Sequence, residues 1–134
     1  MLIAVDFDGT IVEHRYPAIG PEKEGAIDTL KQLAKEGNRL ILWTVRDGQL
    51  LDEAVDYCRS RGLEFYAVNS NTPQNALMGG FKPAGGKVTA DVYIDDRNLG
   101  GLPSWDQIYT QVTGHRRQLQ KASKKGFWAK LFTK

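Results

Sequence analysis

The sequence contains little cysteine, no long apolar run and no compositional repeat. Cys58 is the one cysteine among 134 residues, so no disulfide can form within the chain and nothing indicates an oxidising compartment. It falls on an apolar helix face and is expected in the core. The apolar residues 2–5 form too short a stretch for a signal sequence or a membrane span, and no basic segment precedes them. We therefore expect one globular domain in the cytoplasm.

Acidic residues are missing from the last part of the sequence. Residues 115–134 carry seven Lys and Arg and no Asp or Glu, whereas residues 1–114 carry 16 acidic and 11 basic residues. We therefore divide the chain into a domain, residues 1–114, and a basic C-terminal tail, residues 115–134, whose aromatic side chains would share one face of a helix. Three interpretations of the tail stay open: packing on the domain, contact with an anionic membrane surface or partner, and contact with nucleic acid.

Short apolar segments alternate with segments of helical periodicity. Strands are expected at residues 2–6, 39–44, 63–68 and 91–95, helices at 21–36, 48–61 and 105–112, and an irregular loop at 69–86. This alternation predicts right-handed β–α–β units and an α/β fold, a three-layer α/β/α sandwich with a mainly parallel sheet.

Three of the four expected strands end on a polar residue: Asp6, Thr44 and Asp95. The carboxyl ends of parallel strands lie at one edge of the sheet, where such folds place their function. Asp and Thr also begin turns or cap helices, which explains any one of these residues alone. Three of them in the same register predict one shared site.

Four carboxylates would meet at this site, from Asp6, Asp8, Asp95 and Asp96. Such a cluster repels itself unless a cation neutralises it, and oxygen ligands without His or Cys favour Mg²⁺ over zinc. We therefore predict a magnesium site with positions left for a substrate phosphate.

Several groups near these acids suit a phosphoryl group. The candidates are the Thr44 hydroxyl, the Lys87 ammonium group and the backbone N–H groups of the Gly9-Thr10 turn. Arg46 follows Thr44 closely, and two interpretations stay open for it: it grips a second anionic group of the substrate, or it pairs with the helix residues that follow Asp47.

These residues and their order resemble the four motifs of the haloacid dehalogenase (HAD) superfamily over about residues 1–100. The motifs are Asp6-Phe7-Asp8-Gly9-Thr10, Thr44, Lys87 and Asp95-Asp96. The resemblance implies a phosphatase that hydrolyses phosphomonoesters through an aspartyl-phosphate on Asp6, with Asp8 as general acid and base. It also implies Mg²⁺ held by Asp6, the backbone carbonyl of Asp8 and the Asp95-Asp96 pair, with Asp96 as the preferred direct ligand. Lys87 is preferred to Lys82 as the motif lysine.

The segments between the motifs leave no room for a cap domain, so the chain resembles the capless members of this superfamily. Their open sites act on sugar phosphates, nucleotides or phosphates of macromolecules, and we expect a phosphorylated small molecule here. A homo-oligomer partner or a flexible loop would close such a site. Residues 13–16 lie where the family has a small flap, and they equally suit a polar surface hairpin. Arg97 and Asn98 are expected to orient the metal aspartates.

Other classes of function use similar residues. A receiver-like phosphoacceptor also needs acids, Mg²⁺, Thr and Lys at strand ends, but receivers carry the acidic pair early and the acceptor on a later strand. A non-catalytic HAD-like binding or regulatory module is a further alternative. A P-loop kinase is disfavoured because Gly85-Gly86-Lys87 is followed by Val88.

Overall fold

The computed structural model of the chain describes residues 1–73 and 88–114. The chain divides into two compact units, residues 1–102 and residues 103–134. This division lies after residue 102, whereas the sequence suggested a boundary at residue 114. The predictions for Lys82, Lys87 and the basic tail fall on residues 74–87 and 115–134, which lie outside the described residues.

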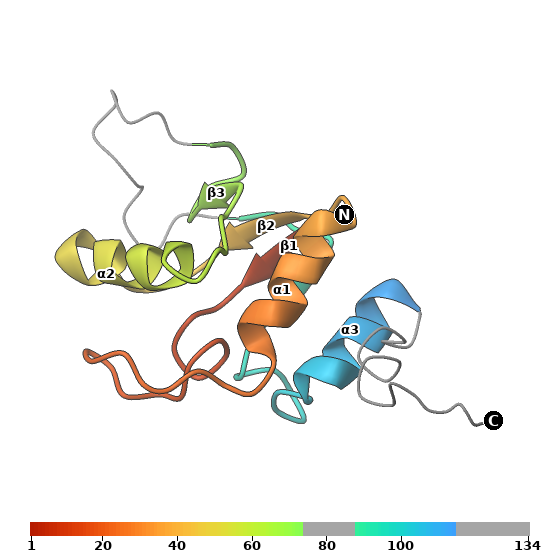
Figure 1. Cartoon of the computed structure of the whole chain (residues 1–134), viewed down its shortest axis with the longest axis horizontal. Coiled ribbons are helices and arrows are strands. Elements are labelled where there is room, and N and C mark those ends of the chain that lie inside the picture. Colours follow the sequence, from red (N-terminus) through yellow and green to blue (C-terminus); the bar gives the residue numbers. More distant parts are fainter. Residues whose placement is uncertain (74–87, 115–134) are drawn as a thin grey trace. The chain divides into compact units, whose positions relative to one another are not determined.

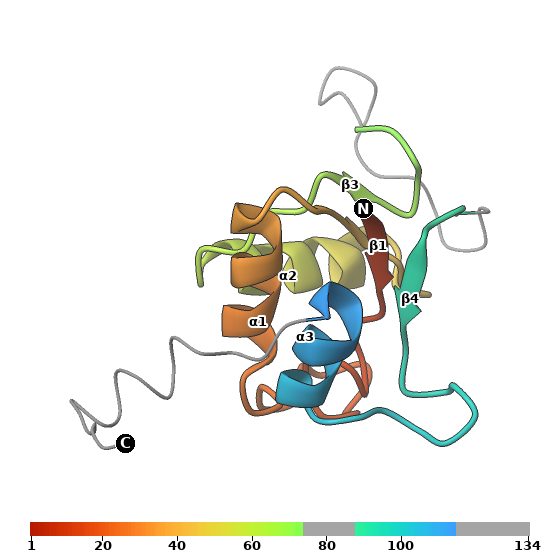
Figure 2. The same cartoon turned by 90° about the vertical axis from the view of Figure 1, so that its right-hand side faces the viewer.

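The first unit is built on a parallel sheet of four strands in the order β3-β2-β1-β4. The strands are β1 (Leu2–Val5), β2 (Arg39–Leu42), β3 (Ala67–Val68) and β4 (Val92–Ile94). The central strand β1 lies between β2 and β4, as Figures 1 and 2 show, and its last residue, Val5, pairs with Leu42 on one side and Ile94 on the other. The predicted α/β fold with a parallel sheet is therefore confirmed.

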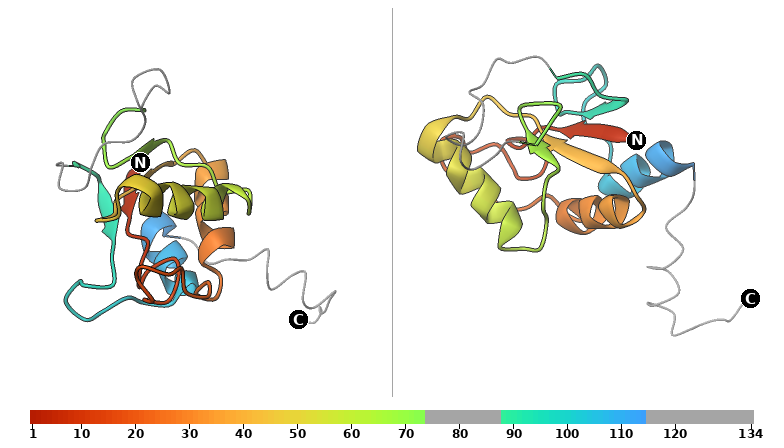
Figure 3. Two further views of the ribbon diagram at one scale, coloured as in Figure 1. Left: turned by 90° about the vertical axis from the view of Figure 1, so that its left-hand side faces the viewer. Right: turned by 90° about the horizontal axis from the view of Figure 1, so that it is seen from above.

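Two helices of this unit, α1 (Ala26–Lys35) and α2 (Gly48–Arg59), lie on the same face of the sheet (Figures 2 and 3). Both β–α–β units step in the same direction across the sheet, and right-handed crossovers then place both helices on one face. Ile3, Ala4 and Val5 are 0% exposed although successive strand residues point to opposite faces, so both faces of β1 are covered. The connection from β3 to β4 includes residues 74–87, outside the described residues.

Helix α1 begins at Ala26, five residues later than the sequence predicted. The expected first turn instead belongs to the base of a loop, because Glu22 forms an antiparallel bridge with Val12 and the Lys23 N–H donates to the Ile11 carbonyl at 2.8 Å. The Glu22 Oε2 accepts a hydrogen bond from the Ile27 N–H at 3.0 Å. An acid predicted inside the helix thus caps it from outside.

The strands end close to their predicted positions, but β3 begins at Ala67 rather than at residue 63. It is an edge strand whose pairing covers only Ile41–Ala67 and Leu42–Val68. Cys58 on α2 is fully buried, as predicted, and this burial raises the pKa of its thiol to about 12.

The described part of the second unit contains helix α3 (Trp105–Thr113), close to the predicted range. Its first turn is closed by a capping box: the Ser104 Oγ accepts from the Gln107 N–H at 3.2 Å, and the Ser104 N–H donates to the Gln107 Oε1 at 3.1 Å. In the part of the chain that the structure describes, no helix combines the length and apolar character needed to cross a membrane.

Candidate active site

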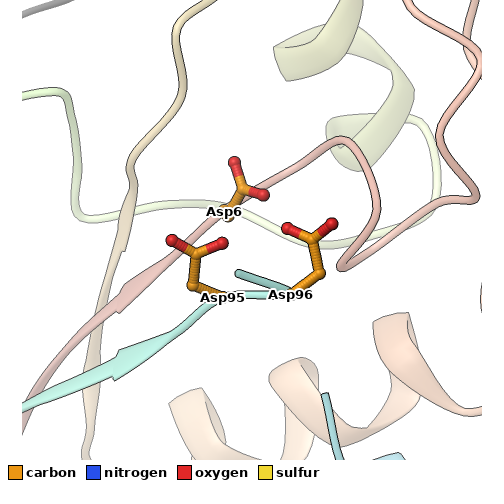
Figure 4. Close-up of side chains that lie close together, drawn as sticks. All are labelled: Asp6, Asp95 and Asp96. Atoms are coloured by element: carbon orange, nitrogen blue, oxygen red, sulfur yellow. The ribbon is translucent and has the colours of Figure 1, made fainter. Parts of the chain in front are cut away.

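Three carboxylates meet at the carboxyl ends of β1 and β4 (Figure 4). Asp6, Asp95 and Asp96 each offer one oxygen that lies within 4.8 Å of those of the other two. The strand register produces this arrangement, because Val5 pairs with Ile94 and the residue after each strand is an aspartate. The Asp6 N–H extends the ladder by donating to the Ile94 carbonyl at 3.0 Å. The structure therefore brings together three of the four predicted acids.

This carboxylate cluster is electrostatically strained. Burial raises the pKa of the Asp6 carboxyl from 3.8 to about 7, the negative charges of Asp95 and then Asp96 add to the rise, and hydrogen bonds with the Phe7 backbone and the Thr10 side chain oppose it. Negative charges that destabilise one another in this way favour a bound cation, and a donor set made of oxygens alone suits a hard one such as Mg²⁺.

The Gly9-Thr10 turn supports the cluster from behind. The Thr10 Oγ1 donates to the Asp6 Oδ2 at 3.2 Å and accepts from the Asp96 N–H at 3.1 Å, so one buried hydroxyl links two of the three acids. A Cβ at Gly9, whose φ is +84°, would overlap the Asp96 Oδ2. The turn's N–H groups were expected to bind phosphate, but they donate to the carbonyls of Val12 and Phe7. In this structure Gly9 and Thr10 shape the cluster.

The fourth predicted acid, Asp8, has its side chain in a different place. Its Oδ2 accepts from the Arg46 Nε and its Oδ1 from the Arg46 Nη2, both at 2.8 Å. The Arg46 side chain is 0% exposed and that of Asp8 8%, so this is a buried two-bond ion pair. Hydrogen bonding with Asp8 raises the pKa of the Arg46 guanidinium above its ordinary value, with desolvation opposing the rise.

Arg46 meets the second of its two interpretations in part, because its side chain pairs with Asp8 and also donates to Leu50 on α2. Its remaining hydrogen bonds go to backbone carbonyls, from Nη2 to Ala18 at 3.0 Å and from Nη1 to Leu50 at 3.3 Å. Its guanidinium carbon lies 5.2 Å from the ring centroids of both Phe7 and Tyr16. These bonds use four of the five N–H groups of a side chain that is 0% exposed, so the guanidinium is enclosed by protein groups. Arg46 connects the first-motif turn, the α2 start and the loop of residues 13–21.

This loop includes residues 13–16, for which a flap or a surface hairpin was predicted, and we use the name flap for the whole loop of residues 13–21. Its base is closed by the bridge between Val12 and Glu22 and by the Glu13 N–H, which donates to the Pro21 carbonyl at 2.8 Å. The Nη2 of Arg46 holds the flap at Ala18. The flap therefore sits against the same guanidinium that binds Asp8.

Thr44, buried at the end of β2, is positioned by a residue that the sequence analysis did not single out. The Asn69 Oδ1 accepts from the Thr44 N–H at 2.8 Å, and the Thr44 Oγ1 accepts from the Arg46 N–H at 3.1 Å. Asn69 is buried with a φ of +51°, and its Nδ2 has no hydrogen-bond partner in the described structure. The sequence contains a pattern that could have identified Asn69: it directly follows β3, as Asp6 directly follows β1.

A cavity of about 500 Å³ opens beside the three carboxylates. Its walls combine acids with aromatic, aliphatic and basic side chains: Asp6, Asp8, His14, Tyr16, Trp43, Thr44, Val45, Asp95, Asp96 and Arg97. The sequence analysis identified the acids, Thr44 and the flap but gave no role to Trp43 or Val45. Arg97 was expected to orient the aspartates, and its backbone N–H donates to the Asp95 Oδ1 at 3.1 Å.

Comparison with known proteins gives one informative match. Neither a protein-family model nor a curated protein matches the chain. A solved structure, described as that of a conserved protein coded by a locus of Bacteroides thetaiotaomicron, is 50% identical with a TM-score of 0.74. The match covers 100% of this chain and 98% of that one.

Proposed function

We propose that this chain, which belongs to the same family as the conserved protein of Bacteroides thetaiotaomicron, is a Mg²⁺-dependent phosphatase of the haloacid dehalogenase type. It hydrolyses phosphomonoesters with Asp6 as nucleophile. The observation that carries the proposal is the meeting of three carboxylates, with oxygens within 4.8 Å of one another, at the wall of a cavity of about 500 Å³.

The residues present fit a magnesium ion. Asp6, Asp95 and Asp96 provide oxygen donors only. Burial and then the negative charges of Asp95 and Asp96 raise the pKa of Asp6, and a divalent cation would stabilise its ionised form. These three residues would hold the ion, together with the Asp8 backbone carbonyl that the resemblance implies. When bound, Mg²⁺ would offset the charge of the acids and of the substrate's phosphoryl oxygens.

Asp6 is suited to attack phosphorus. Thr10 holds one oxygen of its carboxylate, which limits rotation of the nucleophile. In the first step an Asp6 oxygen bonds to phosphorus while the ester P–O bond breaks and the leaving oxygen takes up a proton. In the second step water attacks phosphorus and the Asp6 carboxylate is released.

Asp8 is the proposed proton carrier, since it lines the same cavity as Asp6. Arg46 holds the Asp8 carboxylate in place, and this carboxylate is the group proposed to take a proton from water in the second step. Each Asp8 oxygen accepts one bond from Arg46 and keeps a second lone pair, which can carry the proton that Asp8 donates in the first step. The hydroxyl of Thr44 is the proposed donor to a phosphoryl oxygen, and the role of Lys87 stays a prediction.

The test is turnover of a generic aryl phosphate by the purified chain with Mg²⁺ or with a chelator. Asp6→Asn is expected to abolish turnover while the chain still unfolds in a cooperative thermal transition at or above the wild-type midpoint. Asp52→Asn, an exposed aspartate on α2, is the matched control and should keep full activity. Substantial turnover by Asp6→Asn, or full wild-type activity in chelator, would sink the proposal.

A second candidate function is a phosphoacceptor or regulatory module that does not catalyse multiple turnovers. The observation in its favour is that both oxygens of Asp8 accept hydrogen bonds from Arg46, so the proposed proton carrier is held in an ion pair. Phosphate release per chain distinguishes the two. Many equivalents released support the phosphatase, and one retained equivalent on Asp6 supports the phosphoacceptor.

A further inference from the structure

The candidate active site is larger than a phosphoryl group requires. Ligand sites for small molecules have volumes of roughly 300–1,000 Å³ and combine apolar and aromatic walls with a few polar groups. The cavity of about 500 Å³ falls in this range. Beyond the acids and Thr44, the cavity is lined by Trp43, Tyr16, Val45, His14 and Arg97. These side chains can contact the leaving group of an ester.

The Trp43 ring packs against a second aromatic ring, that of Tyr93. Its centroid lies 5.3 Å from that of Tyr93 on β4, with the two planes at 62°. Tyr93 is itself fixed, because its hydroxyl donates to the Val88 carbonyl at 2.7 Å and accepts from the Ala90 N–H at 3.0 Å. Trp43 is half-buried. It therefore presents a supported aromatic surface to the cavity.

The Tyr16 ring is also supported, on the flap. It lies 5.2 Å from the guanidinium carbon of Arg46, and Arg46 is fixed by its bonds to Asp8, Ala18 and Leu50. Tyr16 is nevertheless 45% exposed. A ring that only filled the core would be buried, so this ring has a free surface at the cavity.

Single exposed aromatic residues on a protein surface need no functional explanation. Here two rings come from segments far apart in the sequence, one from the flap and one from the end of β2, and both line the cavity that contains Asp6. Each is supported on one side and accessible on the other. In other proteins, planar rings of ligands stack on aromatic side chains that are accessible in this way.

We propose that the Trp43 and Tyr16 side chains bind a planar aromatic ring in the leaving group of the phosphate ester. This inference rests on the proposed phosphatase function and names its substrate class: monoesters whose alcohol carries an aromatic ring, in a nucleotide or an aryl phosphate. A ring-free sugar phosphate lacks the group that these two side chains contact.

The experiment compares kcat/KM of wild type and variants for adenosine 5′-monophosphate, phenyl phosphate and ribose 5-phosphate. Trp43→Leu and Tyr16→Leu are each expected to lower kcat/KM about tenfold for at least one ring-bearing ester and to change the ring-free ester less than about twofold. The ratio of variant to wild type removes differences in leaving-group reactivity. Trp43→Phe keeps a ring and should restore much of the loss. Tyr66→Leu, outside the cavity lining, is the control and should leave all three ratios unchanged.

The two arms with rings identify the source of the ring: a loss with the nucleotide alone indicates a nucleobase, and a loss with both indicates any aryl group. Equal losses for ring-bearing and ring-free esters overturn the inference and leave the phosphatase intact. If wild type hydrolyses none of the esters, the phosphatase proposal fails. The inference is then decided by calorimetric binding to Asp6→Asn with Mg²⁺, where equal affinity for adenosine 5′-monophosphate and ribose 5-phosphate overturns it.

Discussion

Asp8 and Arg46 form a buried ion pair in which both carboxylate oxygens accept hydrogen bonds from the guanidinium, each at 2.8 Å. The two residues lie 38 positions apart in the chain. Arg46 also holds the flap at Ala18 and packs against the Tyr16 ring. Arg46 therefore contacts both the proposed proton carrier, Asp8, and the Tyr16 ring in the proposed leaving-group site.

Removing either partner of this pair is expected to be strongly destabilising. Arg46→Ala leaves a buried carboxylate uncompensated, which costs about 3–5 kcal/mol in comparable buried pairs. Asp8→Ala leaves the buried guanidinium charge uncompensated in the same way. In urea unfolding the double variant Asp8→Ala/Arg46→Ala should lose less stability than the sum of the single variants. Strictly additive losses would show that the two side chains do not interact as the distances indicate.

The raised pKa of Asp6 predicts a pH-dependent stability of the metal-free protein. The folded protein holds the Asp6 proton more tightly than the unfolded chain does, with a pKa of about 7 against 3.8. The free energy of unfolding should therefore fall as the pH rises from about 4, with the full loss present above about pH 7. The upper value of this loss is roughly 4 kcal/mol, since one pKa unit corresponds to about 1.4 kcal/mol.

Urea unfolding in chelator at pH 5 and pH 8 measures this dependence. Asp6→Asn removes the titrating group. Its free energy of unfolding should exceed that of the wild type at pH 8, and this difference should be larger at pH 8 than at pH 5. Asp52→Asn should follow the wild-type curve. Parallel curves for wild type and Asp6→Asn would contradict the assignment.

The positions of the clustered acids could be predicted because they depend on local sequence. A polar residue directly after a buried strand must lie at the carboxyl edge of a parallel sheet, and Asp6 and Asp95 are fixed there by the pairing of Val5 with Ile94. The same rule applies to Asn69, which follows Val68. It was overlooked because the residues after it are typical of a loop.

The partners of these residues could not be predicted, because tertiary contacts choose them. No local pattern indicates that Arg46 pairs with Asp8 rather than with a substrate anion. A tertiary contact also explains the late start of α1. Glu22 lies in a segment typical of a helix start, but it pairs with Val12 in an antiparallel bridge instead.

Asn69 combines two properties that a pair of variants can separate. It accepts the Thr44 N–H at 2.8 Å, and its backbone has a φ of +51°. Asn69→Gly keeps the backbone conformation and loses the hydrogen bond, whereas Asn69→Ala loses both. An unsatisfied buried N–H costs about 1–3 kcal/mol. We therefore expect a loss of this size in thermal or urea unfolding for Asn69→Gly and a larger loss for Asn69→Ala, with lower kcat in both. Wild-type stability in Asn69→Gly would show that the amide does not position Thr44.

Gly9 offers a test of the carboxylate cluster with a close control elsewhere in the fold. A methyl group at Gly9 meets two penalties, the positive φ of +84° and overlap with the Asp96 Oδ2, whereas at Gly37, with a φ of +99°, it has no atom within 4 Å. Both Gly→Ala variants should lose about 1–2 kcal/mol to backbone strain. Only Gly9→Ala must also displace Asp96 from Asp6 and Asp95, so only this variant should bind Mg²⁺ about tenfold or more weakly in calorimetry. Equal Mg²⁺ affinity in the two variants would mean that Asp96 is not part of the metal site, and would leave Asp95 as the ligand from β4.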